Sequence, residues 1–205
     1  MAKTSKRYPT YTTPRGVLLF PHLNKPRDYK GNQKFAYDTS FILEGEEADA
    51  LRKQVDELMD QSAREHANKL ADPPYRQHTG ENEHPVEGAF EFRFKISAEI
   101  KTKSGEIWHR KPAIFDRFGV PITDRHVGSG TTAQIKYQAY FWNTGRECGV
   151  TLQPVALMVF DLIEEGSHRS ARDWGFDVQE PSPVPATDEG GSQGDEDEAS
   201  IEVPF

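Results

Sequence analysis

Hydrophobic and polar residues alternate most regularly between Ala89 and Lys103. The apolar members of this segment share one face of an extended chain: Phe90, Phe92, Phe94, Ile96, Ala98 and Ile100. The polar members share the other face: Glu91, Arg93, Lys95, Ser97, Glu99 and Lys101. A period of two residues predicts a β-strand with one face in the core and the other in solvent. Residues Lys34–Leu43 show the same alternation and predict a second long strand.

Between Glu44 and Ala71 the period changes. Apolar residues now recur at steps of three and four, namely Ala48, Leu51, Val55, Leu58, Met59, Ala63, Ala67 and Leu70. This spacing predicts an amphipathic helix. Acidic residues in its first turn complement the positive end of the helix dipole, and Asp72-Pro73-Pro74 ends the pattern.

Shorter apolar segments predict the remaining strands. They are Arg15–His22, Glu106–Phe115, Ala133–Trp142 and Val150–Ile163, the last two joined as a hairpin by Asn143-Thr144-Gly145. Polar segments predict loops at Leu23–Asn32 and Tyr75–Gly88. These elements predict a mainly β fold, an OB-fold-like five-stranded antiparallel barrel with an amphipathic helix inserted after the second long strand. A β-sandwich with a lone helix is the alternative.

Charge is distributed unevenly along the chain. The net charge is −8, and residues 167–205 account for all of it, with two arginines against ten acidic side chains. The first 37 residues are basic, with eight Lys and Arg residues against Asp28. A basic N-terminal segment and an acidic C-terminal segment on one chain indicate a polyanionic partner. They also indicate that the acidic segment competes with this partner for the basic residues.

The chain therefore divides into a flexible basic arm at residues 1–14, a folded body at residues 15–166 and an acidic tail at residues 167–205. Acidic residues, prolines and glycines in the tail predict disorder. The end of the tail breaks this pattern, because the acidic run Asp195, Glu196, Asp197 and Glu198 is followed by Ile201, Val203, Pro204 and Phe205. An acidic tether with an apolar tip is typical of a docking peptide. A tail that only improves solubility is the alternative.

Few residues indicate catalysis. The sequence has no glycine-rich phosphate loop, no cysteine pair and no nucleophile motif. Its single cysteine, Cys148, excludes an intramolecular disulfide and favours a reducing compartment. No apolar run is long enough to span a bilayer, and residues 1–14 lack the apolar centre of a signal peptide. We expect a soluble intracellular binding protein with no catalytic step and no cofactor.

A metal site is an alternative for one predicted loop. His78 and His84 lie there with Glu81 and Glu83, and these residue types bind metal ions. Histidines of a solvated loop are far commoner than ligands, so we expect no metal. Cys148 lies beside a hairpin turn without a paired base in sequence, so we interpret it as a bystander and not as a nucleophile.

Basic and aromatic residues interleave on the predicted strands. A protein that binds single-stranded nucleic acid needs cations along the phosphates and flat rings on which unpaired bases stack. The residues expected at such a surface are Arg15, Lys34, Tyr37, Arg93, Lys95, Lys101, Lys103, Trp108, Arg110, Lys111, Lys136, Tyr137, Tyr140 and Trp142. The alternative is that the rings fill the core while the charges solvate its outside. Both interpretations stay open for Trp108, Tyr140 and Trp142, whereas the regular alternation assigns the phenylalanines of Ala89–Lys103 to the core.

Five segments carry a resemblance to a known family. They are Pro14-Arg15-Gly16-Val17, the helix Ala48–Leu70, Lys101-Thr102-Lys103, Ile135-Lys136-Tyr137 followed by Tyr140-Phe141-Trp142-Asn143-Thr144, and the acidic tail ending in Phe205. In this order they resemble the single-stranded DNA-binding replication proteins of podovirus-type bacteriophages. The resemblance implies an OB fold with an inserted helix that binds single-stranded DNA without strong sequence preference. It also implies that Lys101, Lys103, Tyr140 and Trp142 lie at or near the DNA.

The same resemblance implies a role for the tail. Its acidic residues and terminal aromatic are expected to contact the replicative DNA polymerase and the helicase-primase, and two copies can form a homodimer through their tails. This tail departs from the family pattern because it is less acidic and ends Val203-Pro204-Phe205. We expect a protein that coats single-stranded DNA during replication, recombination and repair in the cytoplasm of the infected bacterial host.

Two other classes of function stay open. A protein–protein adaptor would bind one partner with its β-barrel and another with its tail, and oligonucleotide would not quench its tryptophan fluorescence. A metal-dependent nuclease would need a carboxylate cluster, and none is evident on the predicted strands.

Overall fold

The computed structural model describes residues 8–28, 31, 34–80, 83–102 and 104–164. Its elements, in chain order, are β1 (Thr10–Thr12), β2 (Gly16–Asp28), β3 (Phe35–Glu44), α1 (Gly45–His66), β4 (Lys69–Leu70), β5 (Tyr75–Thr79), β6 (Pro85–Ser97), β7 (Glu99–Lys101), β8 (Ile107–His109), β9 (Ala113–Asp116), β10 (Thr132–Asn143) and β11 (Glu147–Asp161). Strands therefore dominate the described part of the chain, as the sequence predicts.

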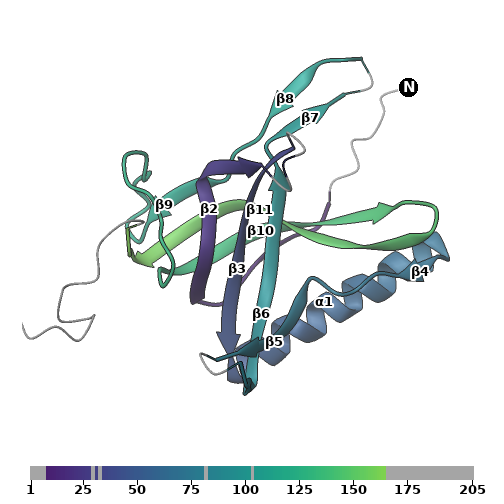
Figure 1. The fold of residues 1–205 in the computed structure, drawn as a ribbon, viewed down its shortest axis with the longest axis horizontal. Helices are drawn as coiled ribbons and strands as arrows, with labels where there is room; N and C mark the ends of the chain where they lie inside the picture. Colours follow the sequence, from purple (N-terminus) through teal and green to yellow (C-terminus); the bar gives the residue numbers. More distant parts are fainter. Residues whose placement is uncertain (1–7, 29–30, 32–33, 81–82, 103, 165–205) are drawn as a thin grey trace, which may run out of the picture. The chain divides into compact units, whose positions relative to one another are not determined.

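Five long strands close into a ring in the order β2–β3–β6–β11–β10 and back to β2 (Figure 1). Neighbouring strands run antiparallel except β6 and β11, which are parallel. The ring is thus the five-stranded antiparallel barrel expected from the sequence, with one parallel pairing between β6 and β11. Of the short strands, β1 pairs with β10, β4 and β9 pair with β11, and β5 pairs with β6. The strands β7 and β8 form a separate hairpin. A closed five-stranded barrel with a helix after its second strand is the predicted OB-type architecture.

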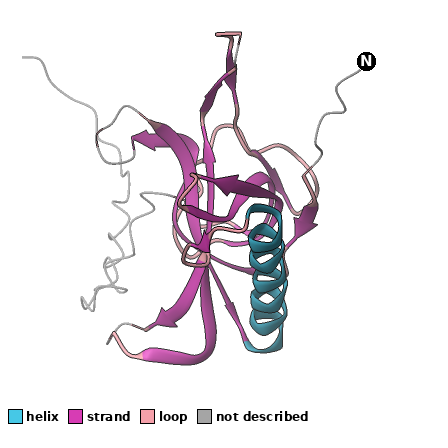
Figure 2. Cartoon of the chain, turned by 90° about the vertical axis from the view of Figure 1, so that its right-hand side faces the viewer, coloured by secondary structure: helices cyan, strands magenta, loops and turns pink. Residues whose placement is uncertain are grey.

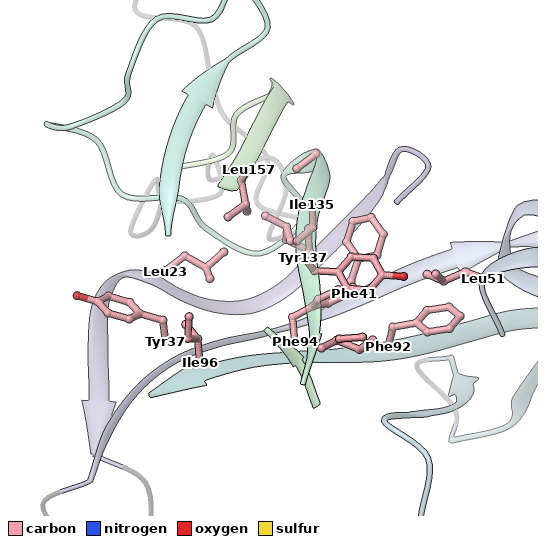
Figure 3. Close-up of a cluster of buried hydrophobic side chains, with 14 of the residues drawn as sticks. Leu23, Tyr37, Phe41, Leu51, Phe92, Phe94, Ile96, Ile135, Tyr137 and Leu157 are labelled. Atoms are coloured by element: carbon pink, nitrogen blue, oxygen red, sulfur yellow. The ribbon is translucent and has the colours of Figure 1, made fainter. Parts of the chain in front are cut away.

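The core follows from the period-two patterns. Phe92, Phe94 and Ile96 point into the barrel from β6, and the first two are fully buried. The ring of Phe94 packs edge-on, with its centroid 5.9 Å from that of Phe41 on β3 and 5.3 Å from that of Tyr137 on β10 (Figure 3). Each such aromatic pair adds about 0.5–1.5 kcal/mol beyond the burial of its surface. The alternation along three strands thus builds a single aromatic core.

Gly16 allows the ring to close where β2 meets both β3 and β10. A Cβ atom at this position would lie 2.4 Å from the Ile42 carbonyl oxygen and 2.6 Å from the Phe41 ring. On the other side, Gly16 is paired with Ala133 of β10. Only glycine permits backbone strands to approach this closely.

The helix α1 lies along one side of the sheet (Figure 2). Its buried face comprises Ala48, Leu51, Val55, Leu58, Met59 and Ser62, which are the positions that the helical period predicts apart from the serine. The helix ends at His66 and not near Ala71. Ala67 adopts a left-handed conformation, with φ +53°, and Lys69–Leu70 pair with β11 as β4. Tertiary strand pairing overrides the helical pattern in these last residues.

Two segments predicted as loops are strands. The β2 strand extends through Leu23–Asp28 and pairs with the start of β3, while Tyr75–Thr79 pair with β6 as β5. Within the predicted flexible arm, Thr10–Thr12 pair with β10 as β1. Conversely, the strand expected at Glu106–Phe115 divides into β8 and β9. Residues 1–7 of the arm and residues 165–205, which include the predicted acidic tail, lie outside the described residues.

Candidate nucleic-acid interface

The outward face of β3 and β6 is polar and charged. Because Phe92, Phe94 and Ile96 point inward, Arg93 and Lys95 point outward on the same strand. Their cross-strand partners on β3 are Ser40 and Asp38, respectively. The structure thus brings two of the sequence-predicted site residues together on one face of the barrel.

Asp38 lies at the centre of this face with a side chain only 6% exposed. Arg27 of β2 donates two hydrogen bonds to it, Nε to Oδ1 at 3.0 Å and Nη2 to Oδ2 at 2.6 Å. The Arg93 Nη2 atom lies 4.0 Å from the same Oδ2. A bidentate arrangement fixes the plane of a guanidinium. One buried carboxylate therefore holds two arginines whose side chains remain 45% and 49% exposed.

A groove of about 440 Å³ crosses this face, formed by residues of β2, β3, β5 and β6 and the segment before β5. Its charged residues are Arg27, Asp38, Arg76, Glu91 and Arg93, which gives a net charge of +1. Arg76 is paired with Glu91 at 2.8 Å, yet its side chain is 73% exposed. The arginines therefore present N–H donors to a ligand in the groove, and guanidinium groups suit phosphate oxygens.

Arg27 and Arg76 are functional candidates that sequence reasoning missed. Both lie in segments predicted as polar loops, where a single arginine carries no positional information. Their place beside Arg93 depends on the pairing of β2 with β3 and of β5 with β6. No local sequence signal brings Arg27 and Arg76 together with Arg93, because these two strand pairs are joined by the pairing of β3 with β6, which spans the whole of α1.

A second hollow of about 470 Å³ lies at the base of the β7–β8 hairpin. Its lining includes the predicted residues Tyr37, Arg110 and Lys111, together with the exposed ring of Phe35, which sequence reasoning missed. The Arg110 Nη1 atom donates to Gln153 Oε1 at 3.2 Å. Burial lowers the pKa of Arg110, and the nearby Tyr140 partly offsets this effect. Tyr37 is 8% exposed, so it forms part of the wall and offers no free ring face.

The β7–β8 hairpin carries the most exposed tryptophan among the described residues. Trp108 is 57% exposed and stands opposite Ile100 across the hairpin. Lys101 is exposed on the neighbouring strand, while Lys103 lies outside the described residues. A ring that is more than half exposed on a two-stranded arm is available for stacking, which favours the binding interpretation of Trp108 over the core interpretation.

The β10 strand divides its predicted residues between two sides. Lys136 is exposed and Tyr140 is 37% exposed, with the Tyr8 ring centroid 5.2 Å from that of Tyr140. Tyr137 points the other way and is fully buried, and burial raises its pKa. Tyr137 is thus a core residue and cannot stack a base. The alternation with Ile135, Ala139 and Phe141 in the sequence already indicated this, since all of them face the core.

The remaining predicted residues are scattered. The Trp142 ring is half-buried and covers Gly149, where a Cβ atom would lie 2.8 Å from its Cζ2 atom. The Arg15 guanidinium lies over the Phe160 ring, 3.8 Å from its centroid. Lys34 is exposed at the start of β3. In the ring, β10 is separated from β3 by β2 and from β6 by β11, so its outward side chains point away from the groove.

The predicted docking residues, Asp195, Glu196, Asp197, Glu198 and Phe205, lie outside the described residues. Within the described residues, no group of three or more His, Cys, Asp and Glu side chains is arranged to hold a metal ion. Cys148 is fully buried, and its Sγ atom lies 3.6 Å from the Asn68 carbonyl oxygen. Among the described residues, no helix combines the length and the apolar character needed to cross a membrane.

The ring order, the helix after the second strand and the basic outward face together define an OB-type barrel with a surface suited to polyanions. Comparison with solved structures supports this assignment of the fold. The chain is similar to gp2.5, a single-stranded DNA-binding protein encoded by bacteriophage T7, with a TM-score of 0.61 and 21% identity over 87% of this chain and 99% of the other.

It is also similar to the single-stranded DNA-binding protein of bacteriophage Enc34 in complex with single-stranded DNA. That match has a TM-score of 0.59 and 12% identity over 81% of this chain and 97% of the other. A second structure of the Enc34 protein matches with a TM-score of 0.53. No protein-family model and no curated protein sequence matches the chain. The resemblance predicted from sequence is therefore confirmed, and at these identities it establishes the fold.

Proposed function

We propose that this chain is a bacteriophage single-stranded DNA-binding protein that coats exposed strands during replication and recombination without a catalytic step. The observation that carries the proposal is the groove on the outward face of β2, β3, β5 and β6, with three arginines in one depression. The outward face of strands two and three is where OB barrels bind oligonucleotides. The similar Enc34 structure, described as a complex with single-stranded DNA, supports the same function.

The proposed DNA surface has a phosphate-binding part and a stacking part. Arg27, Arg76 and Arg93 in the groove bind phosphates. Arg110 and Lys111, which line the second hollow, and the exposed or partly exposed Lys34, Lys95 and Lys101 are the other proposed phosphate-binding residues. Lys103, also proposed from the sequence, lies outside the described residues. Trp108 supplies an exposed ring for the bases. Tyr140 lies on β10, but it is close enough to Arg110 of the second hollow to interact with it, so we expect it to supply another ring. Arg15 and Lys136 lie on the β10 side of the barrel, so we expect a smaller contribution from them.

The tail extends the proposal to regulation and docking. Its ten carboxylates are expected to compete with DNA for the basic surface, while Phe205 provides an apolar tip for a replication partner. The replicative polymerase and the helicase-primase are the partners that the family resemblance implies, and a homodimer through the tails is the corresponding self-association. Docking does not depend on the groove, so it is tested separately from DNA binding, whereas competition by the carboxylates is tested through the affinity for DNA.

A titration of the full chain with single-stranded and duplex oligonucleotides of equal length tests the function. Rings stack only on unpaired bases, so the single strand is expected to bind more tightly. If about three phosphates are neutralised, log Kd against log salt has a slope of magnitude roughly 2, since each single-strand contact contributes about 0.7. Equal affinity for duplex would contradict the stacking surface. No binding of either DNA, with unchanged tryptophan fluorescence, would favour the adaptor.

A further inference from the structure

Phe20 has an unfavourable backbone conformation, and its apolar side chain is exposed to solvent. Its φ is +47°, in the left-handed region that is costly for residues other than glycine and asparagine. Its ring is 73% exposed, so burial of apolar surface offsets little of the free-energy cost of this backbone conformation. Strained residues that persist without a packing reason concentrate at binding sites.

The surrounding structure imposes this conformation. The register of β2 against β3 shifts between Leu19, opposite Ser40, and His22, opposite Asp38, which leaves one extra residue on β2. The Phe20 backbone N–H donates to Ser129 Oγ at 2.8 Å. The Thr39 hydroxyl donates to the Leu19 carbonyl at 3.2 Å. Both bonds hold the peptide unit between Leu19 and Phe20, and a β-bulge is a common device for re-aiming a side chain.

The bulge places Phe20 in the arginine groove. Its side chain lines the same depression as Arg27, Arg76 and Arg93. A phosphodiester chain bound by these guanidinium groups carries a base on every sugar, and an exposed aromatic ring beside the phosphate path is the partner that unpaired bases need. The combination of cations and one exposed ring therefore fits a nucleotide strand better than an apolar peptide.

We propose that Phe20 is a base-stacking platform of the groove, and that the left-handed bulge exists to present its ring. This inference rests on the proposed function and identifies a residue for it. It also accounts for the register shift at this position, after which β2 continues to Asp28. The ring contributes stacking only, while the arginines supply the counterion release.

The test compares Phe20→Asn with wild type in the full chain. Asparagine tolerates positive φ, so the melting temperature is expected to stay constant or rise, whereas single-strand affinity falls roughly 5- to 150-fold. The salt slope stays unchanged, because an aromatic ring releases no counterions. Phe20→Tyr retains a stacking ring and is expected to bind like wild type. A photocrosslink from 5-iodouracil-containing DNA should map to Phe20.

Phe118 provides a matched control. It is 77% exposed at the turn after β9 and does not line the groove. Phe118→Asn is expected to leave DNA affinity unchanged.

Wild-type affinity in Phe20→Asn, or an equal loss in Phe118→Asn, would overturn the inference while leaving the proposed function intact. Loss of affinity together with a lower melting temperature and no recovery in Phe20→Tyr would assign Phe20 a structural role instead. Absence of single-strand binding by wild type would remove the proposed function and the inference together.

Discussion

Asp38 shows, at the scale of single residues, how one carboxylate organises a cationic surface. It is almost fully buried, and it fixes Arg27 and Arg93 by bidentate and longer-range contacts, respectively. The negative charge of a carboxylate beside the phosphate path repels DNA. The same carboxylate orients the arginines that bind the DNA phosphates. The two effects can be separated because they act on different measurements, the stability of the fold and the affinity for DNA.

Asp38→Asn is therefore expected to weaken the fold and strengthen DNA binding. Loss of charge-assisted hydrogen bonds lowers the free energy of unfolding by about 1–3 kcal/mol, measured by urea denaturation. Removal of one negative charge from the groove raises single-strand affinity, most clearly at low salt. Asp124→Asn, at an exposed position outside the groove, is the control for the same change in net charge. If both variants bind DNA equally well, Asp38 has no specific influence on the groove.

At the scale of elements, two hairpins carry tryptophans in different environments. The β7–β8 hairpin extends from the barrel and leaves Trp108 mostly exposed, opposite Ile100 (Figure 1). The β10–β11 hairpin is much longer and packs the Trp142 ring on Gly149. A two-stranded arm contributes little stability of its own. The first hairpin is thus suited to contact a ligand, and the second to support the barrel.

Trp108→Ala is expected to lower single-strand affinity by about 1–3 kcal/mol without changing the melting temperature or the salt slope. Trp142→Ala is expected to lower the melting temperature, because it uncovers the backbone at Gly149 and removes packing between two strands. Fluorescence titration and thermal denaturation of both variants separate the two roles. A melting temperature lowered equally by Trp108→Ala would show that the β7–β8 hairpin is a structural element.

At the scale of the whole molecule, the distribution of charge between the body and the tail is the property that matters for binding. Residues 167–205, with ten acidic side chains and two arginines, account for the full net charge of −8, and the rest of the chain is neutral overall. A neutral body can still bind a polyanion when its cations gather on one face, as the groove arginines do. A tethered polyanion reaches an effective concentration on the order of millimolar near such a face.

Truncation after Arg172 removes the ten carboxylates and is expected to tighten single-strand binding. The gain should be largest at low salt, where competition between the tail and DNA is least screened. Titrations of the full and truncated chains across a salt series measure this effect. Identical affinities at low salt would mean that the tail does not compete for the DNA surface.

Removal of Phe205 alone separates docking from competition. The deletion removes no acidic side chain, so DNA affinity is expected to stay constant. The apolar tip is lost, so binding to the replicative polymerase or helicase-primase, measured by calorimetry with the purified partner, is expected to weaken sharply. Unchanged partner affinity would show that the terminal aromatic is incidental. The truncated chain that lacks the whole tail serves as the reference for complete loss.

The sequence by itself determined much of the core and where the charges lie along the chain, although it assigned Tyr37 and Tyr137, which are buried, to the DNA surface. Period-two patterns identified Phe92 and Phe94 as inward residues and predicted the β10–β11 hairpin, because side-chain direction in a strand depends only on local geometry. The helical period of α1 likewise predicted its buried face. The acidic tail and its apolar end are visible only as sequence, and their predicted roles stay predictions.

Only the tertiary structure decided how the outward residues are grouped. Arg27, Arg76 and Arg93 come from three strands that are brought together by the long-range pairing of β3 with β6, and two of these arginines lie in segments that locally resemble loops. The left-handed bulge at Phe20 and the burial of Asp38 also arise from neighbouring strands. Strand order and register are set by long-range burial and hydrogen bonding, so a local pattern predicts which face a residue takes but not which residues it meets there.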